Sequence, residues 1–296
     1  MGQTPFLDDR RHLDLYAVFG EAELNPSRRF SLNIGGRIDW YDLYGNALSP
    51  RLAAMYFPTA STSLKYIFSH AFRAPDPYDE FYVDQVDLTS PGKSLTPENI
   101  NSQMLLVDHA FNQRIHLSVS GFLNHLNQTI EEVQDATTGD THFTNNRGDS
   151  GRGAEIEAIA KVPSGWSART SYTIEQTHEI DDGTSVLNSP KHLAKFNGTG
   201  PVRKIGFLGT EFLYTSSQRN FLRQHVSSSF LVNTTFSTRS FWNGFQLSAS
   251  CYNLLDRTWS TPTGPEVVQP ATVQDGRTWR FRVTYRPSDN KKWPIK

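Results

Sequence analysis

The alternation of apolar and polar side chains with a period of two is the feature that most constrains how this chain can fold. In residues 278–286 every second side chain is Trp, Phe, Val or Tyr, and the side chains between them are Thr or Arg. Similar alternation occurs in 30–40, 154–160, 166–175 and 245–251. Such a pattern is typical of a β-strand that has one apolar and one polar face.

Applied along the whole sequence, this rule predicts an all-β protein of about thirteen strands. Many of these strands are longer than the roughly 5–6 residues that are usual in soluble sheets. Their lengths suit a tilted strand that crosses a bilayer, which needs roughly 9–11 residues. The expected strands are 12–24, 28–41, 48–57, 61–71, 99–111, 114–132, 143–162, 165–178, 190–200, 203–216, 226–238, 243–254 and 276–286.

The links between these strands alternate between short and long. Short links are expected at 25–27, 58–60, 112–113, 163–165, 201–202 and 239–242, and longer ones at 42–47, 72–98, 133–142, 179–189, 217–225 and 255–275. An up-and-down barrel of the outer membrane has short periplasmic turns and long external loops. A soluble antiparallel sheet with one wet face would also alternate, but the strand lengths and the order of the links together favour a transmembrane barrel.

Composition and charge exclude other classes of protein. The 29 basic and 30 acidic side chains balance, whereas a nucleic-acid-binding protein normally has a basic excess, so no nucleic-acid partner is expected. No run of about 18 apolar residues suggests a transmembrane helix. Residues 1–11 are polar and do not resemble a signal peptide. The single cysteine, Cys251, falls on an apolar face and is expected to act as a small hydrophobic residue.

The sequence contains no recognisable catalytic or metal-binding pattern. It lacks a G-x-S-x-G elbow, an H-E-x-x-H pair and a phosphate-binding glycine loop. His109, His116, His125 and His142 lie close in sequence but not at the spacing of metal ligands. We therefore predict no enzyme activity, no catalytic residues, no metal site and no cofactor.

Six short segments match one family of proteins in its order and at its spacing. The residues that carry the match are Phe72, Arg73 and Pro75 in the segment SHAFRAP, Pro97 and Glu98 in LTPE, Gly153 and Glu155 in GAEIE, Ser189 to His192 in SPKH, Asn253, Leu254 and Asp256 in NLLDR, and Gly276 and Arg277 in QDGRT. Each segment is short, but together they extend over most of residues 12–286. In these segments the chain resembles the TonB-dependent receptors of the bacterial outer membrane.

The positions of these residues have a structural interpretation. Pro97 can begin a strand, where its missing N–H does no harm. Asn253 and Asp256 suit a strand exit, where their side chains can bond to nearby backbone. Gly276 permits a bend into the closing strand.

The resemblance implies a barrel of about 22 strands around a plug, located in the cell outer membrane and surrounded by its lipid. It implies a nutrient receptor that imports a ferric siderophore, cobalamin or a similar scarce ligand with energy from TonB. We expect residues 12–286 to form the C-terminal part of such a barrel, between a polar N-terminal segment (1–11) and a polar C-terminal tail (287–296). The plug, which contacts TonB, and the first part of the barrel are expected to be missing, so that the chain is truncated and inactive alone.

The long segment from Pro75 to Pro91 is acidic and aromatic, and two interpretations of it remain open. It could contact a ligand as an external loop or hold calcium through its carboxylates. A solvated acidic loop is the default expectation. The residues expected to contact a ligand are Arg73, Tyr78, Tyr82 and Trp259.

Two competing hypotheses make different predictions. A passive pore would need an even number of strands in a smaller closed barrel. A soluble β-sandwich used for binding would bury Leu32, Phe245 and Phe281 together between two sheets. In a membrane barrel, the same three side chains face lipid.

Overall fold

A computed structural model describes residues 10, 12–82, 89–90, 94–135, 137, 139–180, 183–264 and 267–286. Thirteen of its strands form one sheet in the order β1-β2-β3-β4-β6-β7-β10-β11-β12-β13-β16-β17-β20. These strands are β1 (Leu15–Ser27), β2 (Phe30–Tyr41), β3 (Gly45–Thr59), β4 (Thr62–Arg73), β6 (Glu98–Asn112), β7 (Ile115–Asn127), β10 (Asp149–Lys161), β11 (Ser167–Glu179), β12 (His192–Val202), β13 (Gly206–Thr215), β16 (Ser229–Thr238), β17 (Phe245–Tyr252) and β20 (Thr278–Tyr285).

Each of the thirteen predicted strands has a counterpart in this sheet, with shifts at the ends of most and a break in two of them. Neighbours in the sheet follow one another along the chain, and the paired strands run antiparallel, as in β12 with β13 and β13 with β16. This is the up-and-down topology that the alternation and the links predicted.

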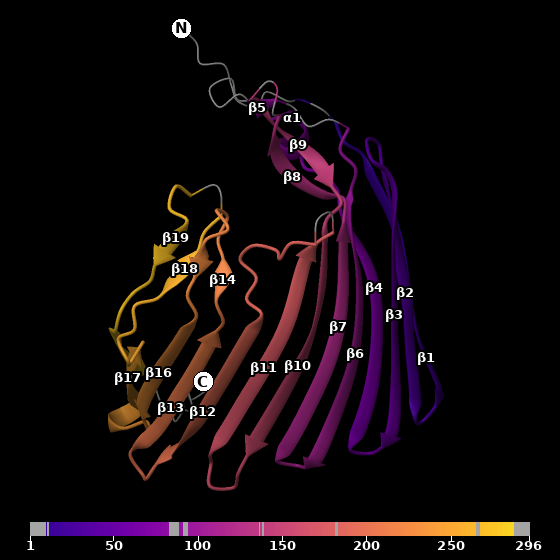
Figure 1. Ribbon diagram of the computed structural model, residues 1–296. Helices are drawn as coiled ribbons and strands as arrows, with labels where there is room; N and C mark the ends of the chain where they lie inside the picture. The colour runs from indigo at the N-terminus through magenta and orange to yellow at the C-terminus, as the bar shows by residue number, and fades with distance from the viewer. Residues whose placement is uncertain are drawn as a thin grey trace, which may run out of the picture. The chain divides into compact units, whose positions relative to one another are not determined.

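The chain divides into two compact units. Unit 1 contains β1–β4 and, beyond their upper ends in Figure 1, a small helix α1 (Pro77–Phe81) and a three-stranded sheet of β5 (Thr89–Ser90), β9 (Thr141–Asn146) and β8 (Thr129–Gln134). Unit 2 contains β12, β13, β16, β17 and β20. Its links carry β14 (Gln218–Arg219), β15 (His225–Val226), β18 (Ser260–Pro262), β19 (Ala271–Val273) and a 3-10 turn η1 (Trp242–Gly244).

Unit 2 has one apolar and one polar face. Phe196 lies opposite Phe212 in the register of β12 and β13, with ring centroids 5.5 Å apart, and Phe281 lies opposite Ala249. The Phe281 side chain is 76% exposed, so no described residue covers this part of the apolar face. On the other face, Asn233 Nδ2 donates to Glu211 Oε2 at 2.7 Å.

Unit 1 is arranged in the same way. Leu32 lies opposite Leu24 on one side and Ala54 on the other, and Leu24 is 50% exposed. Asn33, on the polar face, donates to Glu21 at 2.6 Å. Leu32, Phe245 and Phe281 all belong to one sheet, and the dry centre expected of a β-sandwich is not formed in either unit.

The first link that we expected to be long is short. Residues 42–47 were predicted as a longer connection, but β2 ends at Tyr41 and β3 begins at Gly45. Gly45 has a φ of +75°, which a glycine adopts without strain and which closes the tight turn. The strict alternation of short and long links therefore holds only after this hairpin.

Two of the predicted strands are interrupted. The expected strand 114–132 ends at Asn127 and resumes as β8 after Gln128, whose φ is +57°. The expected strand 143–162 is divided into β9 and β10, and Gly148 between them has a φ of +92°. A Cβ at Gly148 would lie 2.1 Å from the carbonyl oxygen of Leu126. This close approach of two backbones turns the β8–β9 hairpin away from the long strands.

Two smaller observations complete the fold. None of the helices in the described part of the chain is long and apolar enough to cross a membrane. Cys251 is 1% exposed and lies opposite Trp279 on the apolar face, as a small hydrophobic residue would.

Candidate ligand-contacting loops

Arg73 lies at the centre of a charged cluster in unit 1. Its Nε donates to Glu98 Oε2 at 2.7 Å, and its Nη1 is 3.3 Å from Asp79 Oδ2. The second carboxylate oxygen of Glu98 accepts the backbone N–H of Ile130, at the start of β8, at 2.7 Å. We call Arg73, Asp76, Asp79 and Glu98 the Arg73 cluster. It connects the end of β4, the helix α1 and the β8–β9 hairpin.

Asp76 begins α1 through a capping box. Its Oδ1 accepts the N–H groups of Tyr78 and Asp79, and its own N–H donates to Asp79 Oδ2. These hydrogen bonds satisfy backbone N–H groups that the start of a helix otherwise leaves without a partner. Asp79 is only 7% exposed. Asp79 therefore contradicts the expectation of a wholly solvated acidic loop, because its charge is paired inside the cluster. Asp84 and Asp87 lie outside the described residues.

An aromatic group lies beside this cluster. The Tyr78 ring is 4.4 Å from that of Tyr82 and 5.7 Å from that of Phe143 in β9, centroid to centroid. Tyr78 is nevertheless 50% exposed. Nearby, burial and a hydrogen bond to Glu80 raise the pKa of Tyr44 above its ordinary value, so its hydroxyl stays protonated at neutral pH.

Trp259 lies in a different loop region, in unit 2. It lines a pocket of about 370 Å³ formed by the 216–228 link and the 253–277 link. The other lining residues are Asn220, Gln224, His225, Val226, Ser227, Ser228, Thr258, Ser260, Pro270 and Ala271. The indole Nε1 of Trp259 is buried and has no hydrogen-bond partner among the described residues. We call this site the Trp259 pocket.

Asn220 fixes one wall of the Trp259 pocket. It is 2% exposed, and its Oδ1 accepts the backbone N–H groups of Leu222 and Gln224. The opposite wall is held by the backbone, because the Trp259 carbonyl accepts the N–H of Gln274 at 3.0 Å. These hydrogen bonds hold both walls, while the indole N–H has no acceptor among the described residues.

A family model described as TonB dependent receptor-like, beta-barrel matches residues 2–254. The chain belongs to the TonB-dependent receptor family. No curated protein matches it.

Solved structures have the same fold at low sequence identity. The copper transporter OprC matches with a TM-score of 0.75 and 17% identity, covering 92% of this chain and 47% of OprC. A mutant of the ferric enterobactin receptor PfeA from Pseudomonas aeruginosa matches with a TM-score of 0.77 and 15% identity, covering 92% of this chain and 45% of PfeA. The siderophore receptor PirA from Acinetobacter baumannii matches with a TM-score of 0.76 and 14% identity, covering 92% of this chain and 46% of PirA. The chain thus spans less than half the length of these structures.

The family positions near the C-terminus of this TonB-dependent receptor barrel form a second structural cluster. Asn253 is 4% exposed, donates to the Arg257 carbonyl at 2.8 Å and accepts the Arg257 N–H at 2.9 Å. Asp256 accepts the N–H of Arg277, whose Nε donates to the Leu254 carbonyl. A Cβ at Gly276 would lie 3.0 Å from Asp256 Oδ1. These residues join the end of β17 to the start of β20.

The other family positions also have structural neighbours. The Phe72 ring is 5.8 Å from that of Tyr41, and Pro75 is buried. Pro97 directly precedes β6. Gly153 lies in β10, and a Cβ on Gly121 would be 3.9 Å from its carbonyl oxygen. Glu155 accepts the Thr173 hydroxyl at 2.7 Å on the polar face.

The structure separates the four residues that were expected to contact a ligand. Arg73, Tyr78 and Tyr82 lie in unit 1 and Trp259 lies in unit 2. Both ion-pair partners of Arg73 are carboxylates of the protein. Within the described residues, no three His, Cys, Asp or Glu side chains are gathered as metal ligands.

Sequence reasoning missed Asn220, His225 and Gln224 as neighbours of Trp259. They precede Trp259 by more than thirty positions, and only the pairing of β14 with β15 brings His225 and Gln224 to the pocket. A usable signal existed in Asn220, because an Asn at the start of a turn typically bonds to the backbone two residues on.

Proposed function

We propose that this chain forms part of the wall and the external loops of an outer-membrane receptor that imports a nutrient chelate. A ferric siderophore is the favoured cargo, and cobalamin is the alternative. The strands cross the membrane with their apolar face to lipid, and the long links face the outside, as in barrels of this class.

The Trp259 pocket carries the proposal. Its lining polar groups are amides, hydroxyls and an imidazole, together with one indole N–H that has no acceptor among the residues the structure describes. A buried donor without a partner is costly, and a ligand that supplies an acceptor removes that cost. Siderophore-type chelates present several oxygen atoms on their surface, so they offer such acceptors. The names of OprC, PfeA and PirA concern copper, ferric enterobactin and siderophores respectively.

The edges of the sheet support a larger barrel around this chain. Among the described residues, β1 pairs only with β2, and β20 pairs only with β17. An open backbone edge in lipid is costly, because no water satisfies its N–H and C=O groups. We therefore propose that further strands cover these edges, and that energised uptake needs a plug that contacts TonB, supplied outside the described residues.

A titration of tryptophan fluorescence tests the ligand. The protein in detergent is titrated with a ferric catecholate, a ferric hydroxamate and cyanocobalamin. We expect saturable quenching by one ferric chelate, and we expect the Trp259→Phe variant to bind it about 10-fold more weakly, the value of one lost hydrogen bond. The Trp166→Phe variant, altered on the apolar face, should bind normally. Equal affinity of the Trp259→Phe variant and the parent would contradict the pocket assignment.

An uptake assay tests the dependence on a plug. Vesicles or cells that contain this chain alone are compared with ones that also contain a plug-bearing partner and the TonB complex. We expect energised uptake of the chelate only in the second case. Energised uptake by the chain alone would refute the proposal.

A further inference from the structure

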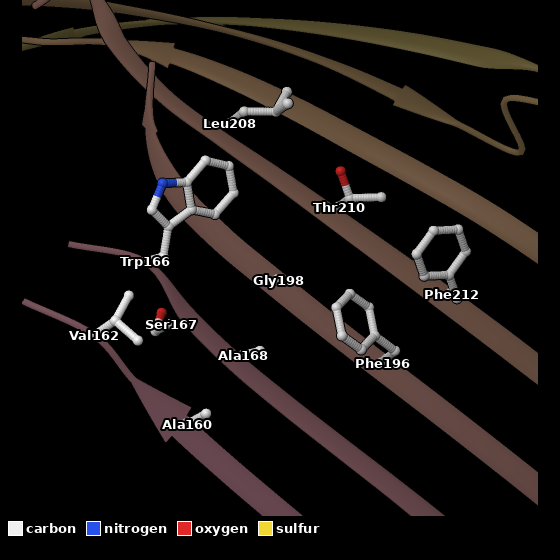
Figure 2. Close-up of a pocket in the computed structure, with 10 residues that line it drawn as sticks. All are labelled: Ala160, Val162, Trp166, Ser167, Ala168, Phe196, Gly198, Leu208, Thr210 and Phe212. Atoms are coloured by element: carbon white, nitrogen blue, oxygen red, sulfur yellow. The ribbon is translucent and has the colours of Figure 1, made fainter. Parts of the chain in front are cut away.

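A groove on the apolar face of unit 2 is distinct from the loop sites. Its volume is about 330 Å³, and it runs across β11, β12 and β13 near their short turns (Figure 2). Ala168 and Gly198 lie opposite each other in the register and form the floor. Trp166, Phe196 and Leu208 project around it, as Figure 2 shows.

The Trp166 wall of the groove is fixed by a glycine. A Cβ at Gly200 would lie 2.0 Å from Cδ2 of the Trp166 ring. The indole therefore lies directly against the backbone of β12, and only a glycine leaves room for it. The ring is still 47% exposed, so its outer face is available to a neighbour in the membrane. An amphipathic indole at the end of a strand is typical of the membrane–water interface.

The turn between β12 and β13, which follows the groove along these strands, is positively charged. Arg203 and Lys204 occupy the turn between β12 and β13, and both are exposed. No Asp or Glu occurs in 158–174 or in 193–210, the stretches that line the groove and its turns. In a barrel of this class short turns face the periplasm, so these cations lie at the level of the inner-leaflet headgroups.

The length of the groove region suits an acyl chain. From Val202 to Phe196, β12 extends over six residues, which corresponds to roughly 20 Å along the strand. Half of the apolar core of a bilayer is about 15 Å thick, and strands cross it at roughly 45°. An acyl chain that follows β12 from the turn would therefore pass beside the Trp166 ring that covers Gly200, cross Gly198 and end near Phe196, within one leaflet.

We propose that this groove is a stoichiometric binding site for an anionic glycerophospholipid of the periplasmic leaflet. One acyl chain lies over Ala168 and Gly198 beside Trp166, and the headgroup phosphate contacts Arg203 and Lys204. The combination of an apolar groove with a basic, acid-free rim selects an anionic lipid over a zwitterionic one. This site is independent of the nutrient pocket.

Brominated lipids test the proposal. The protein is reconstituted in phosphatidylethanolamine vesicles that contain a small fraction of dibromo-phosphatidylglycerol or dibromo-phosphatidylcholine. The Trp166 signal is obtained as the difference between the parent and the Trp166→Phe variant. We expect half-maximal quenching of this signal to require about 5- to 30-fold less phosphatidylglycerol than phosphatidylcholine. This range is the gain in affinity for an anionic lipid that two cations near the membrane surface provide. Equal quenching by both lipids would overturn the proposal.

Three variants locate the preference. In the Arg203→Gln/Lys204→Gln variant, the two brominated lipids should quench the Trp166 fluorescence equally. The Arg28→Gln/Arg29→Gln variant changes another basic short turn, in unit 1, and should keep the preference. The Ala168→Leu variant fills the floor and should lower quenching by phosphatidylglycerol toward that by phosphatidylcholine. A preference that survives the Arg203 and Lys204 changes would overturn the headgroup assignment, and displacement by lipopolysaccharide but not by unlabelled phosphatidylglycerol would overturn the lipid class.

Discussion

The Arg73 cluster and the Trp259 pocket are both formed by links between long strands, but they use their polar groups in opposite ways. In the Arg73 cluster, the Arg73 guanidinium is paired with the carboxylates of Glu98 and Asp79, and Asp79 is only 7% exposed. A capping box satisfies the backbone N–H groups at the start of α1. In the Trp259 pocket, the lining has no Asp, Glu, Lys or Arg, and one buried donor has no acceptor within the described part of the chain. The comparison teaches that charge in a loop can be structural, whereas an unpaired neutral donor is the better sign of a ligand.

The largest expected effect concerns Asn253, which holds the 253–277 link that forms one wall of the pocket. Asn253→Ala removes two hydrogen bonds with Arg257 and places an alanine at a φ of +49°. We expect a loss of about 3 kcal/mol in the free energy of unfolding, measured by urea titration in detergent. Asn253→Asp keeps the acceptor and should lose only about 1 kcal/mol. Equal stability of Asn253→Ala and the parent would show that this cluster does not hold the link.

A smaller loss is expected at Arg73. Arg73→Met leaves Glu98 and Asp79 without their cation, and we expect about 2 kcal/mol of destabilisation, seen as faster hydrogen exchange in β8 and in 94–98. Arg169→Met breaks the ion pair to Glu157 on a strand face, where Arg169 is 63% exposed. This control should lose about 0.5 kcal/mol. If Arg73→Met abolished chelate binding while hydrogen exchange stayed unchanged, the contrast between the two regions would fail.

Tyr44 provides the smallest effect, and it depends on pH. Its pKa is raised by burial and by the hydrogen bond to Glu80, so the neutral hydroxyl is favoured in the folded loop. The stabilisation is fully present below the unfolded tyrosine pKa of about 10 and is lost as pH rises through the folded value. We expect Tyr44→Phe to be less stable than the parent by about 1 kcal/mol at pH 7 to 9, with the difference shrinking at higher pH. A difference that grew with pH would contradict this account.

The strands were the most predictable part of the fold, because the alternation in segments such as 278–285 shows directly which side chains share the apolar face. The short length of the turn that ends at Gly45 and the breaks at Gln128 and Gly148 were not predicted. Their cause is a positive φ or a close backbone contact, such as that of Gly148 with Leu126, and neither changes the hydrophobic pattern.

The candidate site was predicted only in part. The motif positions Arg73 and Glu98 were found, but their mutual ion pair joins residues 25 positions apart. No local pattern could show that this pair engages the guanidinium. The sequence indicated Trp259 but none of the other residues of its pocket. That pocket depends on the paired strands β14 and β15, each of which is only two residues long.

A cysteine scan of β13 tests the central claim, that the apolar face meets lipid and the polar face meets water. In a Cys251→Ser background, spin labels are placed one at a time from Leu208 to Tyr214, and the protein is studied in bilayers. We predict that labels at Leu208, Thr210, Phe212 and Tyr214 are accessible to oxygen, and that labels at Gly209, Glu211 and Leu213 are accessible to a water-soluble nickel chelate. Labels at Phe212 and Leu208 that are shielded from both reagents would contradict the membrane barrel.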